Sequence, residues 1–118
     1  MIDRVYEILR PLKLPIEWQT RPKFNNKSIV VSYHFFNESN LLYGDGDEIE
    51  QGGSLQVDVF SNIDYSTTER DVKQLLKENG FKFYSGEDSI ENIDNNTIIY
   101  HKTLIFNYIE SEVMTYGQ

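Results

Sequence analysis

The 118-residue sequence contains no cysteine, and it has no long apolar run. Without cysteine, disulfide bonds and thiolate chemistry are excluded, and nothing indicates an oxidising compartment. No segment approaches the roughly 20 apolar residues of a membrane-spanning helix. The opening residues, MIDRVYEILRPLKLP, lack the apolar core of a signal peptide. We therefore expect a soluble domain that is made in the cytoplasm, with no membrane partner.

Basic residues are also scarce, with 11 Lys and Arg against 19 Asp and Glu and a formal charge of −8. A general nucleic-acid binder needs clustered basic side chains to displace counterions from phosphates, and the basic residues here are scattered. An acidic surface would let DNA pass nearby without sticking. The simpler interpretation of the charge is solubility.

The sequence offers few residues for catalysis. Its two histidines, His34 and His101, fall in predicted strands, where a pair with an acid could bind zinc but a structural role is commoner. The acidic stretch from Asp45 to Glu50 lacks the ligand spacing of an EF-hand, which leaves weak cation binding or a solvated loop tip. No phosphate loop, nucleophile elbow or paired-carboxylate pattern occurs. We expect no enzyme activity, no cofactor and no metal.

The stretch from Ser54 to Phe81 is the clearest structural signal. Leu55, Val57 and Val59 alternate with polar neighbours, which predicts a half-buried strand. From Ser66 to about Asn79 the apolar residues are spaced as on a helix, and they are Val72, Leu75 and Leu76. Ser66 and Glu69 fit a capping box, although Ser66 and its neighbours could also hold a phosphate at the helix N-terminus. Gly80 fits a left-handed C-terminal residue.

The other elements follow from the same two periods. We predict a helix over Ile2–Leu9 with Ile2, Val5, Tyr6 and Leu9 on one stripe, a short strand near Ile16–Trp18, and a strand from Ile29 to about Asn37. A short strand begins at Phe81, and a long central strand covers residues 97–112. Two acidic stretches, Asn40–Gly53 and Gly86–Asn96, are predicted to be mobile loops or a loosely paired hairpin tip. The tail from Val113 is predicted to be frayed or used in partner contact.

These elements predict one domain over residues 1–118. Its class is α+β, a mainly antiparallel or mixed sheet of four to five strands with two helices packed on it. The element order is helix, short strand, long strand, strand, helix, strand, strand.

The pattern resembles the tail-terminator, or tail-completion, proteins of long-tailed bacteriophages. The resemblance rests on QVDVFS, LLKENGF and YHKTLIFNYI, together with VYEILRPL, LPIEW and IVVSYHFF near the start. It covers nearly the whole chain and is a pattern of fold elements without a catalytic motif. Gln56, Val57, Asp58 and Val59 are the matched positions, and in the family they are scaffold.

The resemblance implies a structural phage or prophage protein. Such proteins assemble as rings, typically hexamers, at the end of the tail tube, where they stop tail growth and provide the head-tail joining surface. The implied partners are other copies of this chain, the tail tube protein and head-tail connector proteins, with DNA passing through unbound. The implied location is the host cytoplasm during virion assembly and then the virion tail.

The acidic segment LLYGDGDEIEQGG departs from the family in length and charge, so its residues Asp45, Asp47, Glu48 and Glu50 are our candidate interaction residues. The segment could line the lumen, contact a subunit or face solvent. Two other functions stay open: a head-tail connector of the adaptor or stopper type, and a small acidic regulatory protein that binds a basic partner.

Overall fold

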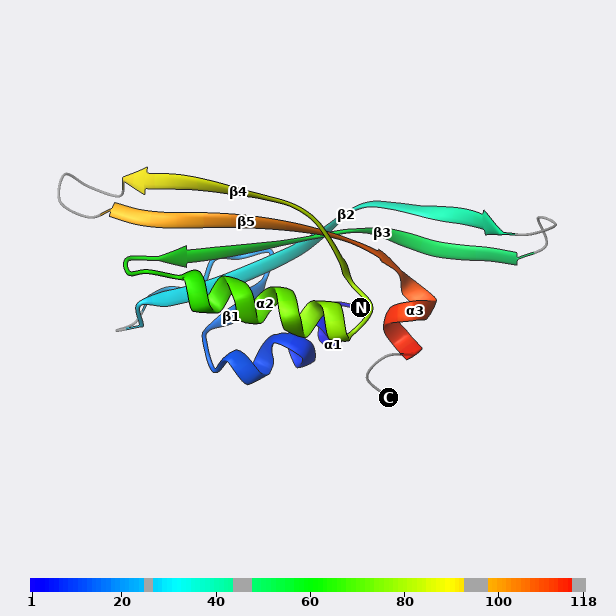
Figure 1. Ribbon diagram of the computed structural model, residues 1–118, viewed down its shortest axis with the longest axis horizontal. Coiled ribbons are helices and arrows are strands. Elements are labelled where there is room, and N and C mark those ends of the chain that lie inside the picture. The colour runs from blue at the N-terminus through cyan, green and yellow to red at the C-terminus, as the bar shows by residue number, and fades with distance from the viewer. Residues whose placement is uncertain (25–26, 44–47, 93–97, 116–118) are drawn as a thin grey trace.

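The computed structural model describes residues 1–24, 27–43, 48–92 and 98–115, and these form a five-stranded sheet with helices on one face (Figure 1). Strand order is β1-β2-β3-β5-β4, and β1–β2 is the parallel pair while the other pairs are antiparallel. The elements in chain order are α1 (Ile2–Leu9), the 3₁₀ turn η1 (Arg10–Leu12), β1 (Ile16–Trp18), β2 (Ile29–Tyr43), β3 (Glu48–Ser61), α2 (Ser66–Glu78), β4 (Lys82–Asn92), β5 (Ile98–Ile109) and α3 (Glu110–Thr115). The predicted α+β class and element order are confirmed.

The main core lies between the sheet and α1 and α2, on the side that we call the helix face. Alternate residues of the central strands point into it, as the two-residue strand period requires. They include Val31 and Tyr33 of β2, Leu55, Val57 and Val59 of β3, and Leu104 and Phe106 of β5, all of which are buried. The hydroxyl of Tyr33 donates a hydrogen bond to the Ile2 carbonyl (2.7 Å), which fastens α1 to this face.

Helix α2 ends where the sequence predicted, but Ser66 is its first helical residue and not its cap. The N-cap is Tyr65, which makes no side-chain cap hydrogen bond, so the predicted capping box is wrong. Asp64, the residue before the cap, accepts bonds from the Ser66 amide (2.9 Å) and hydroxyl (2.6 Å). At the other end, Gly80 has φ = 94°, and the amides of Gly80 and Phe81 bond back to the carbonyls of Lys77 and Leu76. These two bonds form a Schellman motif, which requires the left-handed residue that glycine supplies.

Burial along the helices agrees in part with the predicted stripes. Val72 and Leu76 are fully buried and Leu75 is partly buried against them. In α1, Val5 and Leu9 are buried as predicted, while Ile2 and Tyr6 are exposed. Ile8 takes the remaining buried place. The helix is therefore turned about its own axis relative to the prediction, so that Ile8 faces the core in place of Ile2 and Tyr6.

The two acidic stretches predicted as mobile loops belong to strands over their described parts. β2 and β3 pair as far as Tyr43 opposite Glu48, and β4 pairs with β5 as far as Asn92 opposite Ile98. For residues 40–53 the hairpin alternative is confirmed over the described part. For residues 86–92 the loop prediction is wrong, because a stretch rich in acidic residues and without alternating apolar residues gave no strand signal. In each hairpin, backbone hydrogen bonds between the two strands hold the acidic stretch in place.

The C-terminal prediction also needs correction. Residues from Glu110 to Thr115 form α3, and Val113 is fully buried in the main core, so this part of the tail is neither frayed nor free for a partner. α3 lies on the same side of the sheet as the other helices (Figure 1).

The molecule is elongated, with principal extents of 59 × 25 × 21 Å. Figure 1 shows that the β2–β3 hairpin projects beyond the helices at one end, and the β4–β5 hairpin projects at the opposite end. We call these the β2–β3 arm and the β4–β5 arm. Within the described residues, each of the helices is too short or too polar to cross a membrane.

Candidate functional site

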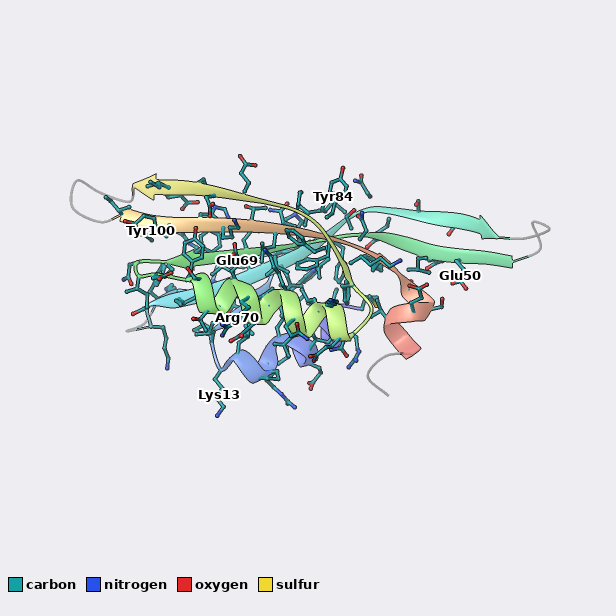
Figure 2. The ribbon with its side chains drawn as sticks, viewed as in Figure 1. Lys13, Glu50, Glu69, Arg70, Tyr84 and Tyr100 are labelled. Carbon is teal, nitrogen blue, oxygen red and sulfur yellow. The ribbon has the colours of Figure 1, made fainter. Side chains whose placement is uncertain are left out.

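The predicted interaction residues lie on or beside the β2–β3 arm. Asp45 and Asp47 lie outside the described residues. Glu48 begins β3, where its backbone pairs with Tyr43, and Glu50 is half-buried opposite Leu41. Figure 2 shows Glu50 on the arm, beyond the helices. Glu48 and Glu50 thus belong to a paired strand and not to a solvated loop.

The two histidines do not form a site. His34 of β2 lies opposite Gln56, whereas His101 of β5 lies opposite Phe60, so β3 separates them and their registers differ. In the part of the chain that the structure describes, no group of three or more His, Asp or Glu side chains could hold a metal ion. The zinc alternative is therefore not supported.

A polar cluster not predicted from the sequence lies on the second face of the sheet, opposite the helices. Asp58 of β3 is buried, and one of its oxygens lies 2.7 Å from His101 Nε2. The carboxylate also accepts bonds from the Gln56 amide (3.0 Å to each oxygen) and the Thr103 hydroxyl (3.0 Å). The register places Asp58 directly opposite Thr103, which brings these side chains together.

Hydrogen bonding sets the ionisation of this pair. Burial favours the neutral form of Asp58, but the bonds from His101, Gln56 and Thr103 outweigh it and hold the pKa of the carboxyl below its usual range. The bond to Asp58, opposed by burial, raises the pKa of His101, and Glu91 adds to the effect. His101 Nδ1 lies 3.4 Å from Glu91. Both ring nitrogens therefore face carboxylates, which favours the imidazolium.

The same cluster fastens the connection between β1 and β2 across the second face. Arg21 forms an ion pair with Glu91 (2.8 Å), and its guanidinium lies 5.1 Å from the centre of the Phe60 ring. Phe60 in turn stacks on His101 at 4.3 Å. Phe24 of the connection packs on a small second core whose buried members are Val30, Phe60 and Ile99. The polar cluster thus joins the β1–β2 connection to the second face of the sheet, and its charged side chains pair with one another.

A hollow of about 810 Å³ opens at the base of the β2–β3 arm, between the start of α1 and α3. We call it the arm hollow. Its described lining includes three aromatic rings and three carboxylates but no lysine or arginine: Trp18, Phe35, Tyr108, Asp3, Glu38 and Glu110. Burial, with Glu38 and Glu110 nearby, raises the pKa of Tyr108 to about 12. Met1, with the N-terminal ammonium group, also lines the hollow and offsets one of the three carboxylates. With the aromatic rings and the remaining negative charge, the hollow is suited to an apolar group accompanied by a positive charge.

An apolar patch lies on the helix face of the β4–β5 arm. Ile90 and Tyr100 are direct cross-strand neighbours and are 62% and 40% exposed. Ile98, on the same face, is 48% exposed, and Ile63 follows Ser61, whose register partner is Tyr100. We call Ile63, Ile90, Ile98 and Tyr100 the tip patch. Grouped exposed residues of this kind indicate an interaction surface.

Comparison with known proteins finds a weak likeness in structure. No family model matches the chain, and no curated protein matches it. Among solved structures, a chain from the virion of a native gene transfer agent particle has a TM-score of 0.49 and 10% sequence identity. That match covers 89% of this chain and 90% of the other. This chain is thus weakly similar to a component of a virion particle.

Proposed function

We propose that this chain is a structural protein of a phage or prophage tail, which forms a ring at the end of the tail tube, ends tail growth and provides the head-tail joining surface. The proposal begins from the sequence pattern described above. In the tail-terminator family that the pattern resembles, the ring is typically a hexamer. The chain would then work by contact with other copies of itself, the tube protein and the connector proteins.

One structural observation carries the proposal: the two β arms extend in opposite directions beyond the helix-covered body (Figure 1). Different surfaces are therefore presented at the two ends of a 59 Å molecule. When unlike surfaces of identical subunits meet, the contact is heterologous, and it closes into a ring if the rotation between subunits permits. An elongated subunit with unlike ends suits such an assembly.

We further propose that the chain has no catalytic role. Within the described residues, buried Asp58 lies against half-buried His101, and their polar atoms are bonded to neighbouring side chains. Each ring nitrogen of His101 faces a carboxylate of this chain, so neither nitrogen is directed at a substrate. This arrangement supports a fastening role for the pair.

The charge distribution fits passage of DNA without binding. Residues 28–69 contain acidic side chains but no lysine or arginine, and this range includes the β2–β3 arm. A lumen lined by the arm would repel phosphates. The variant Asp45→Lys, Asp47→Lys, Glu48→Lys should fold normally, because the sequence predicts these charges to be exposed, and exposed charges contribute little to stability. We expect the variant to impair assembly or DNA passage. Infectious particles at wild-type yield would show that the arm has no such role.

The deciding experiment is electron microscopy of particles assembled without this chain. Overlong tails are expected, because nothing would stop tube growth. Tails of normal length that fail to join heads would instead indicate the connector function, and normal tails joined to heads would contradict both. An acidic regulatory protein would leave particles unaffected and, when purified, bind a basic partner as a monomer.

A further inference from the structure

The tip patch and the arm hollow are unlike surfaces at different ends of one subunit. Tyr100 lies on the β4–β5 arm (Figure 2), whereas the hollow opens beneath the base of the β2–β3 arm, between the start of α1 and α3. Helix α2 lies between these regions in Figure 1. A patch and a hollow so separated cannot meet within one chain, but they can meet between two copies.

Both surfaces are partly apolar. The patch carries exposed isoleucine and tyrosine side chains, and the hollow is lined by Trp18, Phe35 and Tyr108. Trp18 is 41% exposed, so a contact would cover apolar area on both partners. Aromatic residues of this kind are commonly the anchors of protein interfaces.

Their charges are complementary. The hollow contains Asp3, Glu38 and Glu110. At the other end, Lys27 is exposed, and the carbonyl of the next residue, Ser28, accepts a bond from the amide of Asn62 (3.2 Å), which places Lys27 beside Ile63. Residues 18–37 contain no acidic side chain. Lys27 is the basic residue beside the patch, because Arg21 lies on the second face, where it pairs with Glu91.

Two acidic groups near the patch are paired with cations of the same subunit, and a third, Asp64 beside Ile63, accepts hydrogen bonds from Ser66. Asp88 of β4 contacts Lys102 at 3.3 Å and accepts a bond from the Tyr65 hydroxyl. Glu91 forms ion pairs with Arg21 and His101. These pairings reduce the repulsion that the two carboxylates would exert on an incoming acidic surface.

We propose that the tip patch of one copy docks in the arm hollow of the next copy, with Lys27 facing the carboxylates of the hollow. The proposal rests on the proposed ring function, and it names the two surfaces through which neighbouring subunits of the ring would meet. Each subunit contributes the patch to one neighbour and the hollow to the other, so the contact is heterologous and continues around the assembly.

Engineered cysteines test the contact directly, because the wild-type chain contains no cysteine of its own. Ser39→Cys places a thiol in the lining of the hollow, and Ile90→Cys places one in the patch. The matched control is Ser89→Cys, one residue away on β4, since successive strand residues point to opposite faces. The purified single variants are mixed in pairs under mild oxidation, and disulfide-linked dimers are measured by non-reducing electrophoresis.

We expect Ser39→Cys with Ile90→Cys to form at least about tenfold more linked dimer than Ser39→Cys with Ser89→Cys, because docking raises the local thiol concentration. A single chain carrying both Ser39→Cys and Ile90→Cys should give a ladder of oligomers. Equal yields in the two mixtures would overturn the proposal. So would faster linkage of Ile90→Cys to itself than to Ser39→Cys, which indicates a symmetric contact.

Charge exchange provides a second readout that does not depend on thiols. Glu38→Lys and Lys27→Glu should each weaken association by about tenfold, equivalent to about 1.4 kcal/mol, and the double variant should recover much of the loss. Sedimentation over a concentration series measures the effect. Circular dichroism confirms that each variant is folded, and absence of recovery in the folded double variant would contradict the pairing.

The contact and the proposed function can fail separately. Specific linkage of Ser39→Cys to Ile90→Cys, combined with normal tails in particles that lack the chain, would keep the contact and reject the tail function. Overlong tails combined with equal linkage yields would keep the function and reject this contact.

Discussion

Replacement of Gly53 by alanine should destabilise the fold at the point where the β2–β3 arm leaves the body. Phe36 pairs with Ser54 and Ser39 pairs with Gly52, so Gly53 lies opposite a bulge in β2. A Cβ added to Gly53 would lie 3.1 Å from the Glu38 Cα, 3.1 Å from the Tyr108 hydroxyl and 3.2 Å from the Phe36 carbonyl oxygen. Two of these neighbours are backbone atoms, which cannot move aside without shifting the strand.

The size of the effect follows from two opposing contributions. Overpacking costs about 1–3 kcal/mol. Alanine has fewer conformations than glycine in the unfolded chain, and this difference stabilises the folded state by about 0.4–1 kcal/mol. We therefore expect Gly53→Ala to lower the free energy of unfolding by about 1–2 kcal/mol, which corresponds to a fall in Tm of about 4–8 °C for a domain of this size.

The assay is urea unfolding followed by circular dichroism, with the midpoint compared at a constant m-value. Gly86→Ala is the matched control, because a Cβ there would meet side-chain atoms: Lys102 Cε at 3.3 Å, Leu104 Cδ2 at 3.4 Å and Phe83 Cζ at 3.5 Å. These groups can shift, so Gly86→Ala should change the free energy of unfolding by less than about 0.5 kcal/mol. If Gly53→Ala is as stable as Gly86→Ala, the close approach at the bulge does not restrict this position.

Further predictions concern the cluster on the second face and helix α2. Because the pKa of His101 is raised from 6.5 in the folded state, its ion pair with Asp58 stabilises the fold fully below that value and is lost as pH rises through the folded pKa. The lowered pKa of Asp58 has the opposite consequence: its contribution is present above 3.8 and is lost as pH falls through the folded pKa. Urea unfolding of the wild type should therefore show lower stability at about pH 9 than at about pH 6, and His101→Gln should reduce that difference; an unchanged difference would assign it to other groups. In α2, Leu76→Ala should cost about 2–5 kcal/mol, and Leu75→Ala, at a partly buried position, should cost less. The reverse order would mean that the wrong leucine was assigned to the core.

Patterns of burial made much of the fold predictable. Leu55, Val57 and Val59 alternate because they face the main core, and Gly80 identifies the end of α2 because a left-handed residue is required there. The extensions of β2 and β4 into the arms were missed because their acidic, amide and glycine residues give no regular alternation of apolar and polar positions. The capping error arose because Ser66 is a good capping residue by type, but the backbone already enters the helix at Ser66, and the cap position falls on Tyr65.

The polar cluster was not predictable, because it depends on contacts across strands. His101 was recognised as a strand residue, but the register that places it beside Asp58 is a property of the folded sheet. Arg21 and Glu91 are separated by 70 positions in the chain. Alternation did indicate that Asp58 points away from the main core, and a buried carboxylate on that face requires donors. The tail-terminator identity remains a prediction.

The position of β5 determines when the subunit can be completed during synthesis. β5 is the last strand in the sequence, yet it lies between β3 and β4 and pairs with both. Before it emerges from the ribosome, β4 has no strand partner in the described sheet, and the main core lacks Leu104 and Phe106. Pairing that waits for the end of the chain is slow and leaves strand edges exposed meanwhile. The tip patch combines residues of β4 and β5, so it forms only in this final step, and nascent subunits cannot use it to join a growing assembly.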